Sequence, residues 1–286
     1  MCIRDSSEAV HSGIDLIASV IALFAVRRSG RPADDEHPFG HGKVENISGV
    51  VEALLIFVAA GWIIVEAVGK LRQPEPLDAV GWGVGIMALS ALVNALVSRM
   101  LFRVGRETVS VALQADAWHL RTDVYTSVGV LAGLALIVVG HRVFPGVSLD
   151  WLDPVAGLAV AFLILRAAYH LTVGAASDLM DARLGEEETW IRAHIAELKP
   201  TVRGFHKLRT RRAGPTRFVD VHVLVDSSMH LDQAHEISQT IEDAVTARFP
   251  GTSLTVHMEP CDAECAPPCI QDCLLDTEGR RSLGRR

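Results

Sequence analysis

Two copies of a His-x3-Asp motif, each inside apolar sequence typical of a membrane helix, constrain this chain more than any other feature. The first copy is His11 with Asp15, and the second is His119 with Asp123. A spacing of four residues stacks the imidazole and the carboxylate on one helix face. An ionised carboxylate within a bilayer is costly, so an ionisable residue there indicates function. Two such helices facing each other would offer two imidazoles and two carboxylates, a set that suits tetrahedral Zn²⁺.

The simpler alternative for either copy is a His–Asp hydrogen bond that only packs two helices. Packing needs one partner pair, whereas a metal needs a complete set of ligands. Each copy is followed by a Ser-Val pair, at 19–20 and at 127–128, and this repetition favours the metal. We therefore predict an intramembrane metal site formed by His11, Asp15, His119 and Asp123.

The apolar residues are concentrated before residue 180. Hydrophobic residues make up 49% of the chain and the mean hydropathy is +0.28, which is too apolar for an ordinary soluble domain. Most of the apolar segments are close to the ~20 residues that cross a bilayer. They cover residues 8–26, 44–69, 80–98, 124–140 and 154–173. The sequence thus predicts an α-helical transmembrane bundle over residues 1–181, with five visible spans.

Basic residues in the loops predict the orientation of this bundle. Arginine and lysine are richest in residues 27–43 and 99–106, and the alternate loops carry fewer of them. By the positive-inside rule, the richer loops and the C-terminal part are cytoplasmic. Five spans would leave the N-terminus outside, yet residues 1–6 have no signal-peptide character. We therefore expect a sixth helix upstream, so that both ends are cytoplasmic.

From residue 182 onward the sequence is charged and is punctuated by Pro and Gly, which predicts a soluble domain over 182–262. Its patterns predict helices over 186–199 and 231–248, and strands over 204–212, 216–226 and 252–259. This order indicates a small two-layer α+β domain. The net charge of −7 gives no reason to expect nucleic-acid binding.

Residues 263–286 form a tail after this domain, and a repeat of cysteines begins just before the tail and continues into it. Cysteines recur every four residues, but Pro267-Pro268 interrupts any helix that would align them. They are Cys261, Cys265, Cys269 and Cys273. Thiols stay reduced in the cytoplasm, so disulfides are not expected. Metal binding is one alternative here, and we predict an unstructured tail.

Several motifs, in order along the chain, resemble the cation diffusion facilitator family, most of all its bacterial zinc and iron efflux branch. They are the two His-x3-Asp copies, the loop of residues 32–43 and the stretches 208–211 and 214–218. The resemblance implies a homodimeric metal/proton antiporter with six transmembrane helices per subunit and a ferredoxin-like cytoplasmic domain. It also implies that the intramembrane site is the transport site. His11 departs from the family branch, which usually has Asp at this position.

The resemblance implies two further metal sites. Asp34, His37 and His41 match loop ligand positions of the family, where the alternative is a solvated acidic loop. In the cytoplasmic domain, the family binds zinc between the two subunits at positions that correspond to His206, His222, His235, His257 and Glu259. The alternative there is a set of scattered surface histidines. The implied role is to sense cytoplasmic metal and to tighten the dimer.

Lys43 and Asp181 also match family positions. In the resembling proteins these positions form a charge interlock where the membrane and soluble domains meet. The alternative is two interfacial charges in water, which would contribute little to stability.

Together, these features predict a secondary transporter of the bacterial cytoplasmic membrane that exports zinc in exchange for protons. Protons and metal compete for the same imidazole and carboxylate lone pairs, which couples their fluxes. Cd²⁺, Co²⁺ and Fe²⁺ are alternative substrates, because affinity follows ligand type only loosely. A membrane-tethered metal sensor and a cation channel are the alternative functions. An enzyme is not expected, since the sequence has no nucleophile elbow and no phosphate-binding loop.

Overall fold

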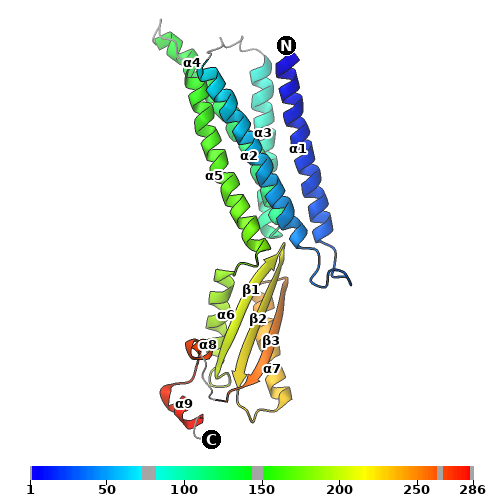
Figure 1. The fold of residues 1–286 in the computed structure, drawn as a ribbon, viewed down its shortest axis with the longest axis vertical. Coiled ribbons are helices and arrows are strands. Elements are labelled where there is room, and N and C mark those ends of the chain that lie inside the picture. The colour runs from blue at the N-terminus through cyan, green and yellow to red at the C-terminus, as the bar shows by residue number, and fades with distance from the viewer. Residues whose placement is uncertain (1, 73–81, 144–150, 263–266, 284–286) are drawn as a thin grey trace. The chain divides into compact units, whose positions relative to one another are not determined.

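The computed structural model describes residues 2–72, 82–143, 151–262 and 267–283. The chain divides into two compact units, Met1–Ser177 and Asp178–Arg286. Five long helices make up the described part of the first unit (Figure 1). They are α1 (Cys2–Ser29), α2 (Lys43–Arg72), α3 (Trp82–Glu107), α4 (Val111–Val143) and α5 (Leu152–Leu179).

Small side chains occupy many of the contacts between these helices. Ala18 and Ala22 on α1 and Ala53 and Ala60 on α2 are buried, whereas large apolar side chains such as Leu23 are exposed. This distribution suits lipid, because small residues let helices approach closely while large apolar ones face the acyl chains. Among the described residues, Lys43–Arg72, Gly85–Glu107 and Pro154–Leu179 are long and apolar enough to cross a membrane. The helical transmembrane fold predicted from the sequence is confirmed.

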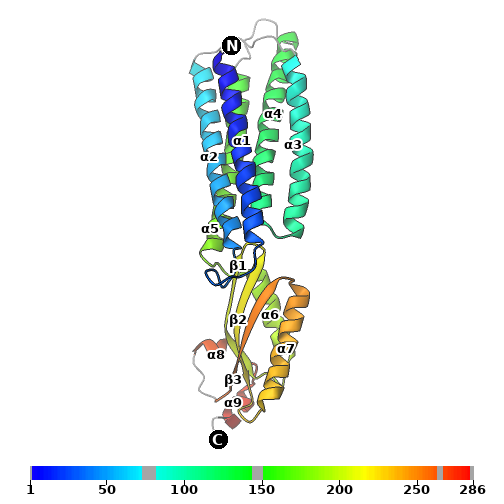
Figure 2. The ribbon, with the colours of Figure 1, turned by 90° about the vertical axis from the view of Figure 1, so that its right-hand side faces the viewer.

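The helices that carry the two His-x3-Asp copies are neighbours. α1 packs against both α2 and α4, and α4 also packs against α2 and α3 (Figure 2). Ser98 of α3 donates its hydroxyl to the carbonyl of Ala117 at 2.8 Å. The aromatic rings of Phe102 and Trp118 meet edge to face, with centroids 5.4 Å apart. These contacts hold α3 and α4 together as a helical hairpin.

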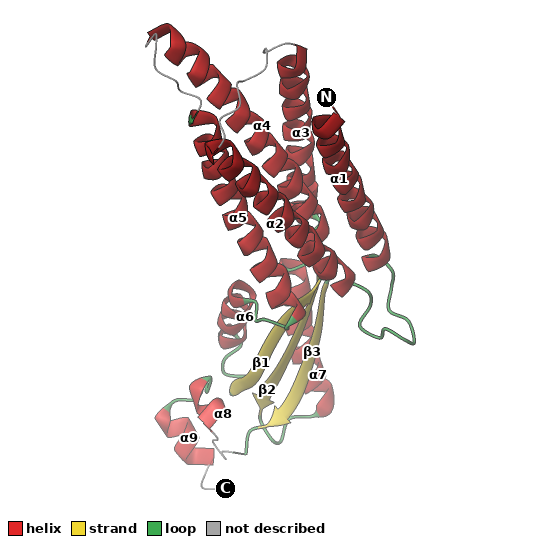
Figure 3. Cartoon of the chain, turned by 45° about the horizontal axis from the view of Figure 1, so that its top comes forward, coloured by secondary structure: helices red, strands yellow, loops and turns green. Residues whose placement is uncertain are grey.

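The second unit is built on a three-stranded sheet (Figure 3). Its elements are α6 (Gly185–Glu197), β1 (Gly204–Ala213), β2 (Thr216–Val225), α7 (Leu231–Arg248), β3 (Thr252–Pro260), α8 (Pro267–Gln271) and α9 (Thr277–Leu283). The strand order is β1-β2-β3, with β1 antiparallel to β2 and β2 parallel to β3. α7 supplies the crossover that a parallel pair requires. The predicted α+β domain is confirmed, with element ends within two residues of those expected.

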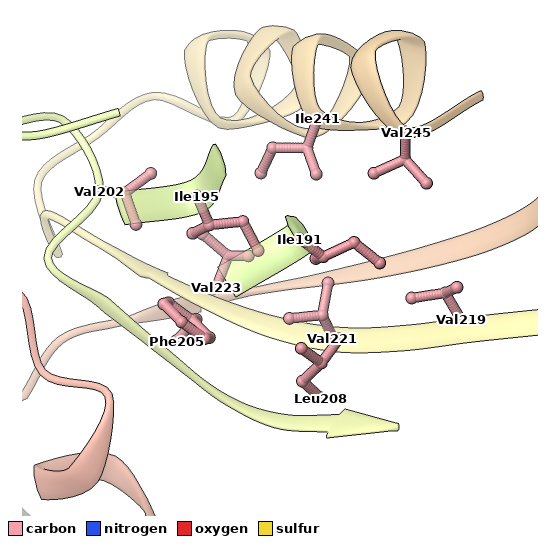
Figure 4. Close-up of a cluster of buried hydrophobic side chains, with 10 residues drawn as sticks. All are labelled: Ile191, Ile195, Val202, Phe205, Leu208, Val219, Val221, Val223, Ile241 and Val245. Carbon is pink, nitrogen blue, oxygen red and sulfur yellow. The ribbon is translucent and has the colours of Figure 1, made fainter. Parts of the chain in front are cut away.

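One face of this sheet buries the hydrophobic core. Val219, Val221 and Val223 alternate along β2 and meet Ile191 of α6 and Ile241 of α7 (Figure 4). The period of two along the strand leaves the intervening side chains, including His222, on the opposite face. The core thus fixes which face of the sheet can hold a metal.

The C-terminal residues 267–283 are structured, in contrast to the unstructured tail expected from the sequence. The backbone of Cys273 pairs with that of Gly204 in an isolated antiparallel β-bridge. The amide of Leu274 donates to the carbonyl of Arg203 at 2.9 Å. The side chain of Leu274 also packs against the hydrophobic core. Pro267-Pro268 does not prevent this arrangement, because the pair begins α8, where a helix needs no N–H donor.

Candidate metal centres

The predicted transport site involves α1 and α4. His119 is 2% exposed on α4, and Asp123 lies half-buried one turn further along the same helix. His11 and Asp15 lie on α1, and their side chains are outside the described residues. The packing of α1 against α4 agrees with a site shared by the two helices. The four-ligand site itself stays a prediction.

The loop between α1 and α2 gathers three candidate ligands. Oδ1 of Asp34 lies 3.3 Å from Nδ1 of His37, and Oδ2 of Asp34 lies 3.4 Å from Nε2 of His41. Adjacent ligands on a tetrahedral zinc are separated by about 3.3 Å, given metal–ligand bonds of about 2.0–2.1 Å. One ligand atom from each residue lies within 4.8 Å of the other two. The two distances from Asp34 to the imidazoles therefore match the ligand spacing of a zinc site, and the loop site stays a prediction.

Local backbone bonds give this loop its shape. The amide of His37 donates to Oδ1 of Asp34 at 2.7 Å, and the amide of Asp34 donates to the carbonyl of His37. The His37 amide is the main reason that the pKa of the Asp34 carboxyl lies below its usual value, with further lowering by the two imidazoles. Asp34 therefore remains a charged ligand at neutral pH. His41 is 4% exposed, and its carbonyl accepts the amide of Val44 as α2 begins.

The strand register assembles a second cluster in the soluble unit. His206 of β1 pairs with His222 of β2, which in turn pairs with His257 of β3. Glu259 is two residues beyond His257 on the same face. Its Oε1 lies 2.7 Å from Nδ1 of His222, and its Oε2 lies 3.0 Å from Nε2 of His206. His206, His222 and Glu259 each offer a ligand atom within 4.8 Å of the others.

The remaining predicted ligands lie at different distances from this cluster. His257 is beside it, with Nε2 3.5 Å from Oε1 of Glu259. His235 is exposed on α7 and is outside the group whose ligand atoms converge among the described residues. Burial raises the pKa of Glu259, but the hydrogen bond that it accepts from His222 and the charges of the three neighbouring imidazoles outweigh burial, so the pKa is lowered. The carboxylate is charged at neutral pH, as a zinc ligand must be.

The two residues of the predicted charge interlock lie in different units. Lys43 is the first residue of α2. Asp181 follows α5 with a positive φ of 58°, and its Oδ1 lies 3.5 Å from Nη1 of Arg211. Sequence reasoning did not identify Arg211 as a partner of Asp181. The interlock stays a prediction.

The cysteines do not join either of the two converging groups among the described residues. Cys261 is buried, and Cys269 and Cys273 are half-buried. Cys265 lies outside the described residues.

Sequence reasoning also missed three buried acids in the membrane unit. Glu45 and Glu52 lie on α2, and Asp116 lies on α4. The signal was available, because the two glutamates interrupt an apolar segment and Asp116 shares a helix face with His119 three residues later.

Comparison with known proteins agrees with these observations. Residues 6–180 match the cation efflux transmembrane domain, and residues 184–261 match the cytoplasmic domain of cation efflux proteins. The chain is 36% identical over 253 residues to the cation-efflux pump FieF of Klebsiella pneumoniae, covering 88% of this chain and 81% of that protein. It is 37% identical over 257 residues to an uncharacterized transporter of Synechocystis sp., covering 90% and 81% respectively.

A solved structure of CzrB in its zinc form is 35% identical and covers 28% of this chain and 91% of that chain, with a TM-score of 0.27. The two domain matches together cover most of the chain and fall in the order of its two units. This protein therefore belongs to the cation efflux family, the cation diffusion facilitators, and is a metal cation efflux transporter.

Proposed function

We propose that this transporter exports zinc from the cytoplasm in exchange for protons, as a homodimer in a bacterial cytoplasmic membrane. The observation that carries the proposal is the pair of neighbouring helices α1 and α4, each with a His-x3-Asp motif. Two neutral imidazoles and two carboxylates balance the charge of one divalent cation, which removes the electrostatic cost of holding it in the membrane.

Protons compete with zinc for these ligands. A zinc ion arriving from the cytoplasm displaces protons from the imidazoles and carboxylates of the site. When the site opens to the other side, where protons are more abundant, protons replace the metal. Return of the protonated site to the cytoplasmic side completes the exchange, so the proton gradient drives export. Imidazole is suited to this role because its ordinary pKa is about 6.5.

The other two clusters would hold resident zinc ions. Asp34 lies at the donor spacing of a tetrahedral site from both His37 and His41. His206, His222 and Glu259 converge on one face of the cytoplasmic sheet. Zinc bound at the cytoplasmic cluster would neutralise Glu259 and fix the three strands of the sheet relative to one another. We propose that this zinc senses cytoplasmic metal and tightens the dimer, with His257 as a further ligand beside the cluster and His235 as a ligand donated by the second subunit.

The test is zinc uptake into proteoliposomes that contain a zinc-sensitive dye. The full chain is compared with Asp123→Ala and with a matched control, Glu66→Gln, which removes an exposed carboxylate of α2 that pairs with Lys70 at 3.0 Å. We expect uptake to require an acidic lumen, to stop in Asp123→Ala and to continue in the control.

Other outcomes would refute the proposal in different ways. Uptake that ignores the pH gradient would identify a channel. Zinc binding without any uptake would identify a membrane-tethered sensor. Equal transport rates for cadmium, cobalt or ferrous iron would refute zinc as the preferred substrate.

A further inference from the structure

Two buried carboxylates of the membrane unit have no role in the three predicted metal sites. Glu52 of α2 is fully buried and Asp116 of α4 is 9% exposed. The hydroxyl of Ser48 donates to Oε1 of Glu52 at 2.8 Å. Within the described residues, Oε2 of Glu52 and Oδ1 of Asp116 have no hydrogen-bond partner. Buried oxygens without a partner are rare in proteins and costly to stability, so a compensating ligand is expected.

The two carboxylates lie near each other on helices that pack together. Glu52 and Asp116 are close enough to interact electrostatically, and Asp116 interacts in the same way with His119. Asp116 precedes His119 by three residues, so both lie on one face of α4. Asp116 is also nearer the end of α4 that follows the basic, cytoplasmic loop. In the predicted orientation, Asp116 therefore precedes His119 and Asp123 on the way from the cytoplasm along α4.

We propose that Glu52 and Asp116 form a transient binding station for the divalent cation on its way from the cytoplasm to His119 and Asp123. The proposal rests on the export function proposed above. Two carboxylates balance the charge of one divalent cation, and each of the two has one buried oxygen without a hydrogen-bond partner among the described residues. Among the described residues, the carboxylate oxygens of Glu52 and Asp116 and the imidazole of His119 do not all lie within 4.8 Å of one another. The station therefore binds weakly and through retained water, which lets the ion move on.

The station predicts a specific kinetic signature. Glu52→Gln keeps the size and the Ser48 hydrogen bond but removes the negative charge. We expect the KM for zinc uptake by the full chain to rise about tenfold, because one Coulombic attraction to the cation is lost. The uptake rate at saturating zinc should stay near that of the wild type, since the transport ligands are intact. Glu66→Gln is the matched control, and its KM should not change.

A double variant tests whether the two acids act as one site. Asp116→Asn alone should also raise KM, and adding it to Glu52→Gln should raise KM by less than the product of the two separate effects. If Glu52→Gln does not assemble, Asp116→Asn carries the same test. A wild-type KM in both single variants, or a loss confined to the saturated rate, would overturn the station. Gradient-driven uptake by the wild type in that same experiment would show that the export function stands without it.

Discussion

Ser110, the residue before α4, donates a 2.6 Å hydrogen bond to the carboxylate of Glu45 near the start of α2. Ser29, the last residue of α1, donates to the other oxygen of the same carboxylate at 2.5 Å. Glu45 is 3% exposed, so these bonds form away from water. One side chain thus joins the ends of the two helices that carry the predicted transport ligands to the start of a third.

This junction predicts a loss of stability in Glu45→Ala. Both serine hydroxyls lose their charged acceptor in a buried place, which should cost about 2–4 kcal/mol. Thermal unfolding of the detergent-solubilised chain would measure the change. Ile47→Ala, at an exposed position of α2, is the control and should unfold close to the wild type. Equal unfolding of Glu45→Ala and the control would show that the junction does not stabilise the bundle.

The loop cluster predicts one bound zinc that export does not require. His41→Ala removes a buried ligand, so we expect zinc bound per chain to fall by one in equilibrium dialysis while gradient-driven uptake continues. Glu36→Gln, an exposed acid of the same loop, should bind as many ions as the wild type. An unchanged stoichiometry in His41→Ala would count against the loop site.

The cytoplasmic cluster predicts a different loss. His222 lies between His206 and His257 in the sheet, so His222→Ala should remove zinc from this domain. Zinc-dependent protection of β1 and β3 from hydrogen exchange would disappear. His230→Ala removes an exposed imidazole next to α7 and should leave this protection intact. The prediction fails if zinc still protects the strands of His222→Ala.

The lowered pKa of Glu187 predicts how the stability of the soluble unit changes with pH. Burial raises the pKa of Glu187, but the hydrogen bond from Nε of Arg217 at 3.0 Å and the charges of Arg212 and Arg217 outweigh burial, so the pKa is lowered from 4.5. A lowered pKa in the folded state gives stability that is present above pH 4.5 and is lost as the pH falls through the folded value. We expect Glu187→Gln to reduce hydrogen-exchange protection of β2 by about 1 kcal/mol near pH 7.

This difference between Glu187→Gln and the wild type should shrink in acid. Glu186→Gln changes the exposed neighbour and should match the wild type at both pH values. A difference that is constant with pH would mean that the ion pairs do not carry the effect.

The C-terminal segment predicts a protected thiol. Leu274→Ala removes an apolar contact with the core and should weaken docking of the segment by roughly 2 kcal/mol. Cys273 would then react faster with an alkylating reagent, which mass spectrometry can follow. Ile270→Ala, at an exposed position of the same segment, should leave the rate unchanged. Equal rates in Leu274→Ala and the wild type would show that the side chain does not hold the segment in place.

A second feature of this segment concerns Gly204. A Cβ at Gly204 would lie 3.3 Å from the carbonyl oxygen of Asp272 and 3.4 Å from Cα of Cys273. Both atoms belong to the backbone rather than to the end of a flexible side chain. A side chain at this position would therefore press on the backbone of the segment, which would have to shift slightly away from β1.

Local sequence determined most of the fold and one candidate metal site. Apolar length predicted the long helices, because a helix satisfies its own backbone in lipid. The strand predicted over 216–226 is β2, whose alternating valines face the core. The loop cluster of Asp34, His37 and His41 was also accessible from sequence, because its ligands lie within eight residues and local backbone bonds shape it.

Tertiary structure decided the features that join distant residues. The cytoplasmic cluster depends on strand register, since His206, His222 and Glu259 meet only when three strands align. The C-terminal segment looked unstructured because its order comes from Arg203 and the core rather than from its own residues. The burial of Glu45, Glu52 and Asp116 likewise arises where α1, α2 and α4 pack, and periodicity within one helix carries no information about its neighbours.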